Sequence, residues 1–197
     1  NHSFKVDIYA KTDIHNLKQN IQFQAPFIIA SFDLETSIAD DRILCAAVII
    51  DQLDSLGQRK EMPEEYTFIG SEIEIMKGMT DLIRRKDPDV ITGYNIDNFD
   101  MGRIVDRANF VSGNNKSLKA ETMGWGRVSS SEQGRRRDTL FPNRGVSRAW
   151  NMAGRCVMDA WWQARMALRP RRETLRYVTE LLFPENEELK KMDVDAC

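Results

Sequence analysis

The chain has 197 residues, of which 42% are hydrophobic and 29% charged, as in a globular protein of about one domain with a substantial core. A net charge of −2 argues against a protein that coats nucleic acid with its whole surface, and two histidines exclude a histidine-rich metal site. No apolar stretch approaches the about 20 residues of a membrane-spanning helix, and the N-terminus lacks the features of a signal peptide.

The three cysteines, Cys45, Cys156 and Cys197, have no paired spacing that would indicate a disulfide framework. Cys45 and Cys156 fall in apolar runs, and we expect both to be buried thiols in strands. Unpaired thiols favour a reducing, intracellular location.

Residues 1–24 predict a strand at 4–8 and a short helix at 14–19. We interpret them as the tail of a preceding domain or a linker, and we expect residues 25–197 to form the main domain.

The first core strand is predicted at Phe27–Phe32, and two acids, Asp33 and Glu35, follow it directly. Residues two apart on a strand point to the same face, so these carboxylates would lie side by side. Two neighbouring acids repel each other, and a metal ion between them would relieve the repulsion. The alternative is an edge strand whose polar face simply meets water.

Two more strands and a helix are predicted next. The strands lie at 43–50 and 66–69, and the helix begins after Ser71, which forms a capping box with Glu74. Its apolar positions recur at helical spacing, so its methionines are expected in the core. The helix ends before Pro88.

A second acidic position follows a short strand at Val90–Thr92. Gly93 permits a sharp exit from this strand, Asn95–Asn98 has turn chemistry, and Asp100 opens a helix that runs to Phe110. A hard cation bound at the first strand would need a third carboxylate, which Asp100 could supply. The alternative for Asp100 is a helix N-terminal acid stabilised by the helix dipole.

The C-terminal part is predicted to be irregular over 116–150, with a short strand at 157–158 and a helix at 174–183. Between residues 127 and 176 there are twelve arginines against four acids, a local net charge of +8. An arginine-rich half could bind phosphate while the acidic remainder binds metal. The alternative for Arg135–Arg137 is a solvated loop tip.

Together these segments resemble the 3′→5′ proofreading exonuclease domain of family B DNA polymerases, in its archaeal and eukaryotic replicative branch. The first exonuclease motif of that family, Asp-x-Glu after an apolar strand, matches Phe32–Thr36. The second, an asparagine followed by an aromatic residue and an aspartate, matches Asn95–Asp100. Gly154–Asp159 is similar to the family's Gly-Arg-x-x-x-Asp strand, and Glu173–Val178 resembles the helix that follows.

The resemblance implies an α/β fold, a ribonuclease-H-like mixed β-sheet flanked by helices, with a hairpin within residues 116–150. It also implies two-metal hydrolysis of a phosphodiester bond at a single-stranded 3′ end, with Mg²⁺ as the cofactor and Mn²⁺ as a substitute. The catalytic and metal-binding residues would be Asp33, which bridges both ions, Glu35, which binds the water-activating ion, and Asp100, which supports the second ion.

Three further residues would hold the DNA end by the same resemblance: Thr36, Asn95 and Phe99. For Phe99 an equally good interpretation is a core anchor for the turn, and Tyr94 carries the same two alternatives. Trp161 and Trp162 are adjacent, so on a helix they would face different ways, and we expect at least one to pack in the core.

The family's third motif, Tyr-x-x-x-Asp, has no match. Tyr177 is followed four residues later by Leu181, and neither Asp193 nor Asp195 has a tyrosine four residues before it. Asp159 and Asp193 are the remaining candidates for a fourth acid. We therefore expect a C-terminally incomplete exonuclease domain of a family B DNA polymerase that is weak or inactive alone.

The expected partners are single-stranded or primer–template DNA and the remaining polymerase domains, without a membrane. The expected location is intracellular and DNA-associated, in the cytoplasm of a prokaryote or the nucleus of a eukaryote. The main alternative is a catalytically inactive exonuclease-like module that serves a polymerase as a scaffold or DNA-binding part. A stand-alone exonuclease is the third possibility, and the polymerase-like wording between the motifs argues against it.

Overall fold

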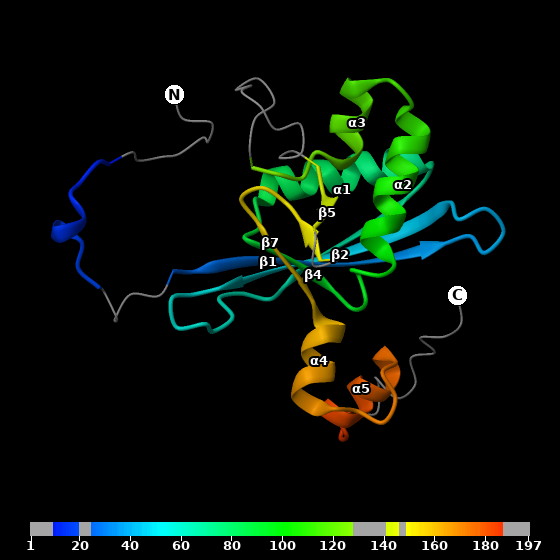
Figure 1. Cartoon of the computed structure of the whole chain (residues 1–197). Coiled ribbons are helices and arrows are strands. Elements are labelled where there is room, and N and C mark those ends of the chain that lie inside the picture. The colour runs from blue at the N-terminus through cyan, green and yellow to red at the C-terminus, as the bar shows by residue number, and fades with distance from the viewer. Residues whose placement is uncertain (1–9, 20–24, 128–140, 146–148, 187–197) are drawn as a thin grey trace.

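A computed structural model describes residues 10–19, 25–127, 141–145 and 149–186 of the chain (Figure 1). A five-stranded sheet forms its centre, and a two-stranded hairpin and five α-helices surround this sheet. The strands are β1 (Phe27–Thr36), β2 (Ile43–Leu53), β3 (Glu64–Ile69), β4 (Val90–Gly93), β5 (Asn143–Arg144), β6 (Trp150–Asn151) and β7 (Cys156–Asp159). The helices are α1 (Glu72–Lys86), α2 (Asp100–Ser112), α3 (Lys116–Met123), α4 (Ala160–Leu168) and α5 (Leu175–Leu182), with a 3₁₀ turn at Ile14–Asn16.

The sheet is mixed, with the strand order β3-β2-β1-β4-β7. Strands β1, β2 and β3 pair antiparallel, whereas β4 runs parallel to β1 and β7 parallel to β4. The predicted α/β fold class, a mixed β-sheet flanked by helices, is confirmed. Because β1 is the central strand, the interpretation of its acids as the polar face of an edge strand is wrong.

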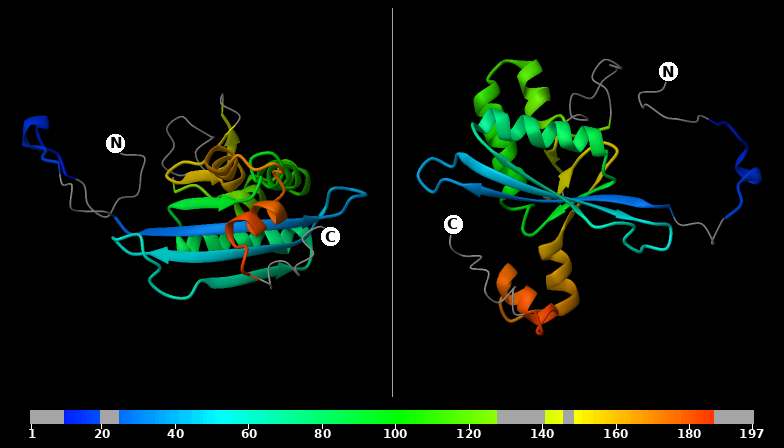
Figure 2. Two further views of the ribbon diagram at one scale, coloured as in Figure 1. Left: turned by 90° about the horizontal axis from the view of Figure 1, so that it is seen from below. Right: turned by 180° about the vertical axis from the view of Figure 1, so that it is seen from behind.

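Helices α1, α2 and α3 cover one face of the sheet, and α4 and α5 lie on the other (Figures 1 and 2). The core fills the space between the sheet and the first three helices, as shown by the buried side chains of β1 and by the fully buried Trp125. On β1, Ala30, Phe32 and Leu34 point into this core. The alternating residues, which include Asp33, therefore point to the face on which α4 and α5 lie.

Helix α1 forms as predicted. Ser71 accepts a hydrogen bond from the backbone of Glu74, whose carboxylate accepts from the Ser71 backbone in return. Met76 and Met79 are completely buried, which confirms their expected place in the core. The helix ends at Lys86, and its C-cap, Asp87, has a left-handed conformation directly before Pro88.

The third segment that resembles the family, Gly154–Asp159, serves to position strands rather than to supply a catalytic group. Gly154 has a φ of 80°, which lets the chain turn into β7. The neighbouring Arg155 guanidinium donates to the carbonyl oxygens of Trp125, at 2.6 Å, and Pro88, and pairs with the Asp87 carboxylate at 2.7 Å. These bonds attach β7 to the segment that leads into β4.

Two helices, α3 and α4, were not predicted. Asn115 looked like turn material that ends α2, yet its side chain also accepts from two backbone N–H groups and starts α3. The expected hairpin within 116–150 is present as β5 and β6. In α4 no residue is buried, so the expectation that Trp161 or Trp162 packs in the core is wrong.

Other predictions fall outside or differ from the described part of the chain. The strand expected at 4–8 and Arg135–Arg137 lie outside it. Cys156 is exposed, contrary to expectation, whereas Cys45 is half-buried. No helix within the described ranges is long and apolar enough to cross a membrane.

Candidate active site

Asp33 and Glu35 lie side by side on the open face of β1. Opposite them on β2 are Ala47 and Cys45, and the register shifts immediately after Glu35. β1 therefore continues past the predicted end at Phe32, and both acids are part of the strand. A regular central strand fixes the direction of both carboxylates.

The pKa of Asp33 is raised above its usual value, first by burial and then by the negative charge of Glu35. A hydrogen bond from the Leu34 backbone opposes this increase. A bound cation would relieve the repulsion that disfavours the ionisation of Asp33.

Asp100 is the third predicted acid, and the structure brings it to the same strand. It is the first residue of α2, it is only 2% exposed, and its Oδ1 accepts a hydrogen bond from the Leu34 backbone at 3.2 Å. Burial raises the pKa of Asp100 to about 7, and the charge of Asp33 contributes next. The two carboxylates, 67 residues apart in sequence, therefore interact directly through their charges.

The segment between β4 and α2 makes this approach possible. A Cβ at Gly93 would lie 2.5 Å from the carbonyl oxygen of Phe32, so only glycine lets β4 pass this close to β1. Asn95 has a φ of 62°, a left-handed conformation that asparagine tolerates well. Ile96 is fully buried and its carbonyl accepts from the Met101 backbone at 3.0 Å, which fixes the start of α2.

Asp159, a remaining candidate for the fourth acid, is only 4% exposed and is bonded to backbone groups. Its carboxylate accepts from the N–H groups of Asn95 at 2.8 Å, Asp97 at 2.9 Å and Trp161 at 2.8 Å. It thus holds the turn before Asp100 and caps α4 at the same time, a role that the sequence did not reveal. The other candidate, Asp193, lies outside the described residues.

The residues expected to hold DNA lie at the end of β1 and in the segment between β4 and α2. Thr36 is half-buried at the end of β1, and the side-chain oxygen of Asn95 accepts from the Asn98 amide at 3.0 Å. Phe99 is 41% exposed, so it is not a core anchor. The Arg103 guanidinium lies 5.4 Å from the centre of the Phe99 ring and limits its freedom.

Tyr94, directly after β4, has a structural role. Its hydroxyl donates to the carbonyl oxygen of Glu173 at 2.6 Å, which connects the end of β4 to the segment before α5. This contact ties the α4–α5 part to the sheet.

The donor set of the three acids suits a hard divalent cation, because all ligands are carboxylate oxygens. Within the part of the chain that the structure describes, however, no three acidic, histidine or cysteine side chains are arranged to hold a metal ion. Part of the reason is that Asp100 directs its Oδ1 to the backbone of β1. The charges of the acids are coupled, but their ligand geometry is incomplete.

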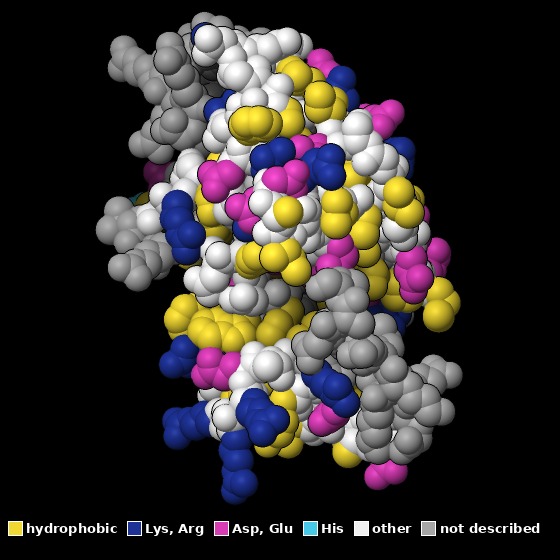
Figure 3. Space-filling view, turned by 90° about the vertical axis from the view of Figure 1, so that its right-hand side faces the viewer, with side chains coloured by type: hydrophobic (Ala, Val, Ile, Leu, Met, Phe, Trp, Pro, Cys, Tyr) yellow, Lys and Arg dark blue, Asp and Glu magenta, His cyan; other side chains and the backbone are white. Residues whose placement is uncertain are grey.

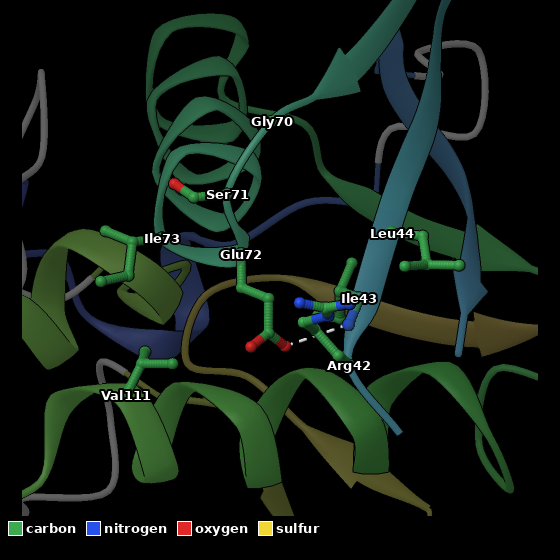
Figure 4. A pocket seen from close by; sticks show the side chains of 8 residues that line it. All are labelled: Arg42, Ile43, Leu44, Gly70, Ser71, Glu72, Ile73 and Val111. Carbon is green, nitrogen blue, oxygen red and sulfur yellow. Dashed lines mark hydrogen bonds between the residues drawn. The ribbon is translucent and has the colours of Figure 1, made fainter. Parts of the chain in front are cut away.

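A pocket of about 450 Å³ lies elsewhere, between the start of α1, the start of β2 and α2 (Figure 4). The main acidic residue of the pocket is Glu72. Its carboxylate accepts a hydrogen bond from the Ile43 backbone at 3.0 Å and pairs with the largely buried Arg107 at 2.5 Å. None of the predicted site residues lines this pocket, and its main charges already neutralise each other.

Comparisons with known proteins show which family the chain belongs to. The family described as DNA polymerase family B, exonuclease domain, matches residues 1–178. The DNA polymerase delta catalytic subunit of Mesocricetus auratus is 36% identical over 93 residues, which are 45% of this chain and 8% of that protein. The solved family B DNA polymerase of the hyperthermophilic archaeon Pyrobaculum calidifontis is 23% identical, with a TM-score of 0.49, over 79% of this chain and 18% of that one.

The chain thus spans a small part of the length of both relatives. The family match covers most of its residues and includes β1, β4, the start of α2 and Asp159. This chain belongs to the family of family B DNA polymerase exonuclease domains.

Proposed function

We propose that the chain is the 3′→5′ proofreading exonuclease domain of a family B DNA polymerase and acts on single-stranded 3′ ends. The observation that supports this most is that Asp33 lies beside Glu35 on the central strand while its charge acts on the buried Asp100 at the start of α2. Neighbouring acids of which two, Asp33 and Asp100, have raised pKa values are typical of a catalytic site rather than of a stabilising surface.

Asp33, Glu35 and Asp100 are the residues that would hold Mg²⁺, for which Mn²⁺ would substitute. When bound, a divalent ion lowers the pKa of a coordinated water and stabilises negative charge on the leaving oxygen. The contribution of the chain is to fix Asp33 and Glu35 on a rigid strand and to hold Asp100 against the Leu34 backbone. Because the pKa of Asp100 is raised to about 7, its carboxyl group gains or loses a proton near neutral pH.

The DNA end would contact Thr36, Asn95 and Phe99. An exposed aromatic ring beside the carboxylates can stack on a terminal base without reading its identity, as proofreading requires. Arg103 keeps this ring in place from α2, and Asp41 in turn pairs with Arg103 at 2.8 Å.

The remaining expectations are part of the same proposal. The domain would extend over 25–197, its partners would be DNA and the other domains of the polymerase, and it would be located where that polymerase meets DNA.

The second candidate is a catalytically inactive exonuclease-like module of a polymerase. The observation in its favour is that the described residues contain no ready group of three metal ligands. A fourth acid supplied by a segment outside this chain would favour the active exonuclease.

A gel assay on a 5′-labelled single strand with Mg²⁺ separates the two candidates. The assay compares this chain, a version extended at its C-terminus, and both with Asp33→Ala. The matched control is Asp106→Ala, which removes an exposed acid from α2. We expect digestion by the extended version and its Asp106→Ala variant, and none after Asp33→Ala. Asp33-dependent digestion by the chain itself would also support the nuclease, and inactivity of every version would favour the inactive module.

A further inference from the structure

The α4–α5 part presents an aromatic pair stacked with an arginine. The rings of Trp161 and Trp162 meet edge to face with their centres 4.7 Å apart, and the Arg165 guanidinium lies 5.1 and 5.7 Å from those centres. Trp162 is 43% exposed, so this assembly faces solvent instead of the core. Arg165 also pairs with Glu173 at 3.3 Å, which holds it in this position.

Three more arginines lie directly beyond this assembly, in the turn between α4 and α5. Arg169, Arg171 and Arg172 are exposed, and none of them pairs with an acid among the described residues. Figure 3 shows basic side chains gathered at the lower end of the molecule, where α4 and α5 lie. Positive charge beside an exposed aromatic ring is the combination with which proteins bind single-stranded nucleic acid without sequence preference.

The surface lies on the same side of the sheet as the candidate active site. Helices α4 and α5 are on the face to which Asp33 and Glu35 point, opposite α1, α2 and α3 (Figures 1 and 2). The two places are also connected through Asp159, whose carboxylate bonds both the turn before Asp100 and the first turn of α4.

We propose that Trp162, Arg165, Arg169, Arg171 and Arg172 form a binding surface for single-stranded DNA that receives the strand leading to the active site. This proposal rests on the proposed function, because it takes the 3′ end to lie at Asp33. Arginines neutralise backbone phosphates, and an exposed indole stacks on bases of any sequence. An acidic protein segment would use the same charges but would gain nothing from the exposed indole.

The test measures binding of a fluorescein-labelled oligothymidine to this chain by anisotropy, in EDTA so that no digestion occurs, over a range of NaCl concentrations. The charge variant carries Arg169→Gln, Arg171→Gln and Arg172→Gln. The matched control carries Lys60→Gln, Arg85→Gln and Lys116→Gln, which removes the same charge from exposed positions on other elements. Circular dichroism checks that all variants are folded.

We expect the charge variant to lower the slope of log affinity against log salt by about 2, because each phosphate contact on a single strand contributes about 0.7. The control should keep nearly the slope of the unaltered chain. Trp162→Ala should weaken binding about tenfold, whereas Trp162→Phe should retain most of it.

Equal slopes for the charge variant and the control would overturn the proposal, as would a polyglutamate peptide that displaces the oligonucleotide as well as unlabelled DNA does. If the slopes are equal but the extended version still digests DNA through Asp33, the proposed DNA-binding surface is wrong and the proposed exonuclease function stands. If the unaltered chain binds no single strand and no version digests DNA, both proposals fail.

Discussion

The starts of α2 and α4 each carry a buried aspartate, and the two differ in how their charge is satisfied. Asp159, before α4, accepts three backbone N–H groups at 2.8 to 2.9 Å. Asp100, at the start of α2, accepts a hydrogen bond from the Leu34 backbone at the longer distance of 3.2 Å and experiences the negative charge of Asp33. Both are less than 5% exposed, so burial alone does not distinguish them.

The comparison teaches how to separate a structural acid from a functional one. A carboxylate surrounded by backbone donors has its charge stabilised and holds elements together. A carboxylate that is buried beside another acid destabilises the fold, and such a cost persists at functional sites. By this criterion we assign Asp159 a structural role and propose that Asp100 is part of the site.

The largest expected effect is on stability when Asp159 is removed. Asp159→Ala leaves three backbone donors without their acceptor, and each bond to a charged group contributes about 1.5–3 kcal/mol. We expect the free energy of unfolding to fall by roughly 5 kcal/mol in urea denaturation. Asp159→Asn keeps one carbonyl oxygen and should lose about half as much. Similar losses from the exposed control Asp106→Ala would remove the distinction.

Asp100→Asn should raise the free energy of unfolding, whereas Asp159→Ala should lower it. The carboxyl of Asp100 titrates near 3.8 when unfolded and near 7 when folded, so the folded state holds the extra proton between these values. Stability therefore falls as pH rises from about 4 to about 7, and the penalty is complete above pH 7. Because Asn cannot ionise, the variant should be more stable at pH 8 by up to about 4 kcal/mol. The difference should vanish near pH 4, and parallel pH profiles would show that Asp100 is not under this strain.

A divalent cation should relieve the same repulsion. Mn²⁺ at ten times its dissociation constant should raise the free energy of unfolding by about 1.4 kcal/mol. Its affinity should increase with pH up to about 7, since Asp100 must lose its proton to interact with the ion. Thermal unfolding of the chain with and without Mn²⁺, at pH 6 and pH 8, measures both effects. Asp33→Ala should abolish the shift, and a shift that survives this change would place the ion elsewhere.

The sequence was sufficient to predict the strands near the candidate site, and physical reasons explain this success. β1, β4 and α1 are specified locally, by β-branched runs and a capping box. The convergence of Asp33 and Asp100 followed from strand alternation and the turn at Gly93.

The failures concern properties that depend on distant contacts. Asp159 has partners more than 60 residues away, so its role was not visible in its own segment. Helix α4 has no buried side chain to create an amphipathic pattern, and it was missed for that reason. Exposure of Phe99 and Cys156 was likewise decided by packing, which the sequence does not display.

The smallest expected effect tests how firmly the two regions are joined. Tyr94→Phe removes the hydroxyl that donates to the Glu173 carbonyl, a bond of about 1 kcal/mol. Because this bond attaches the segment before α5 and not the core, the amides of α5 should exchange with deuterium about fivefold faster, whereas those of α1 should be unchanged. Tyr177→Phe is the matched control, since its hydroxyl makes no hydrogen bond to another described residue. If both variants leave α5 exchange unaltered, Asp159 alone carries the connection, and the α4–α5 part is attached to the sheet only through the start of α4.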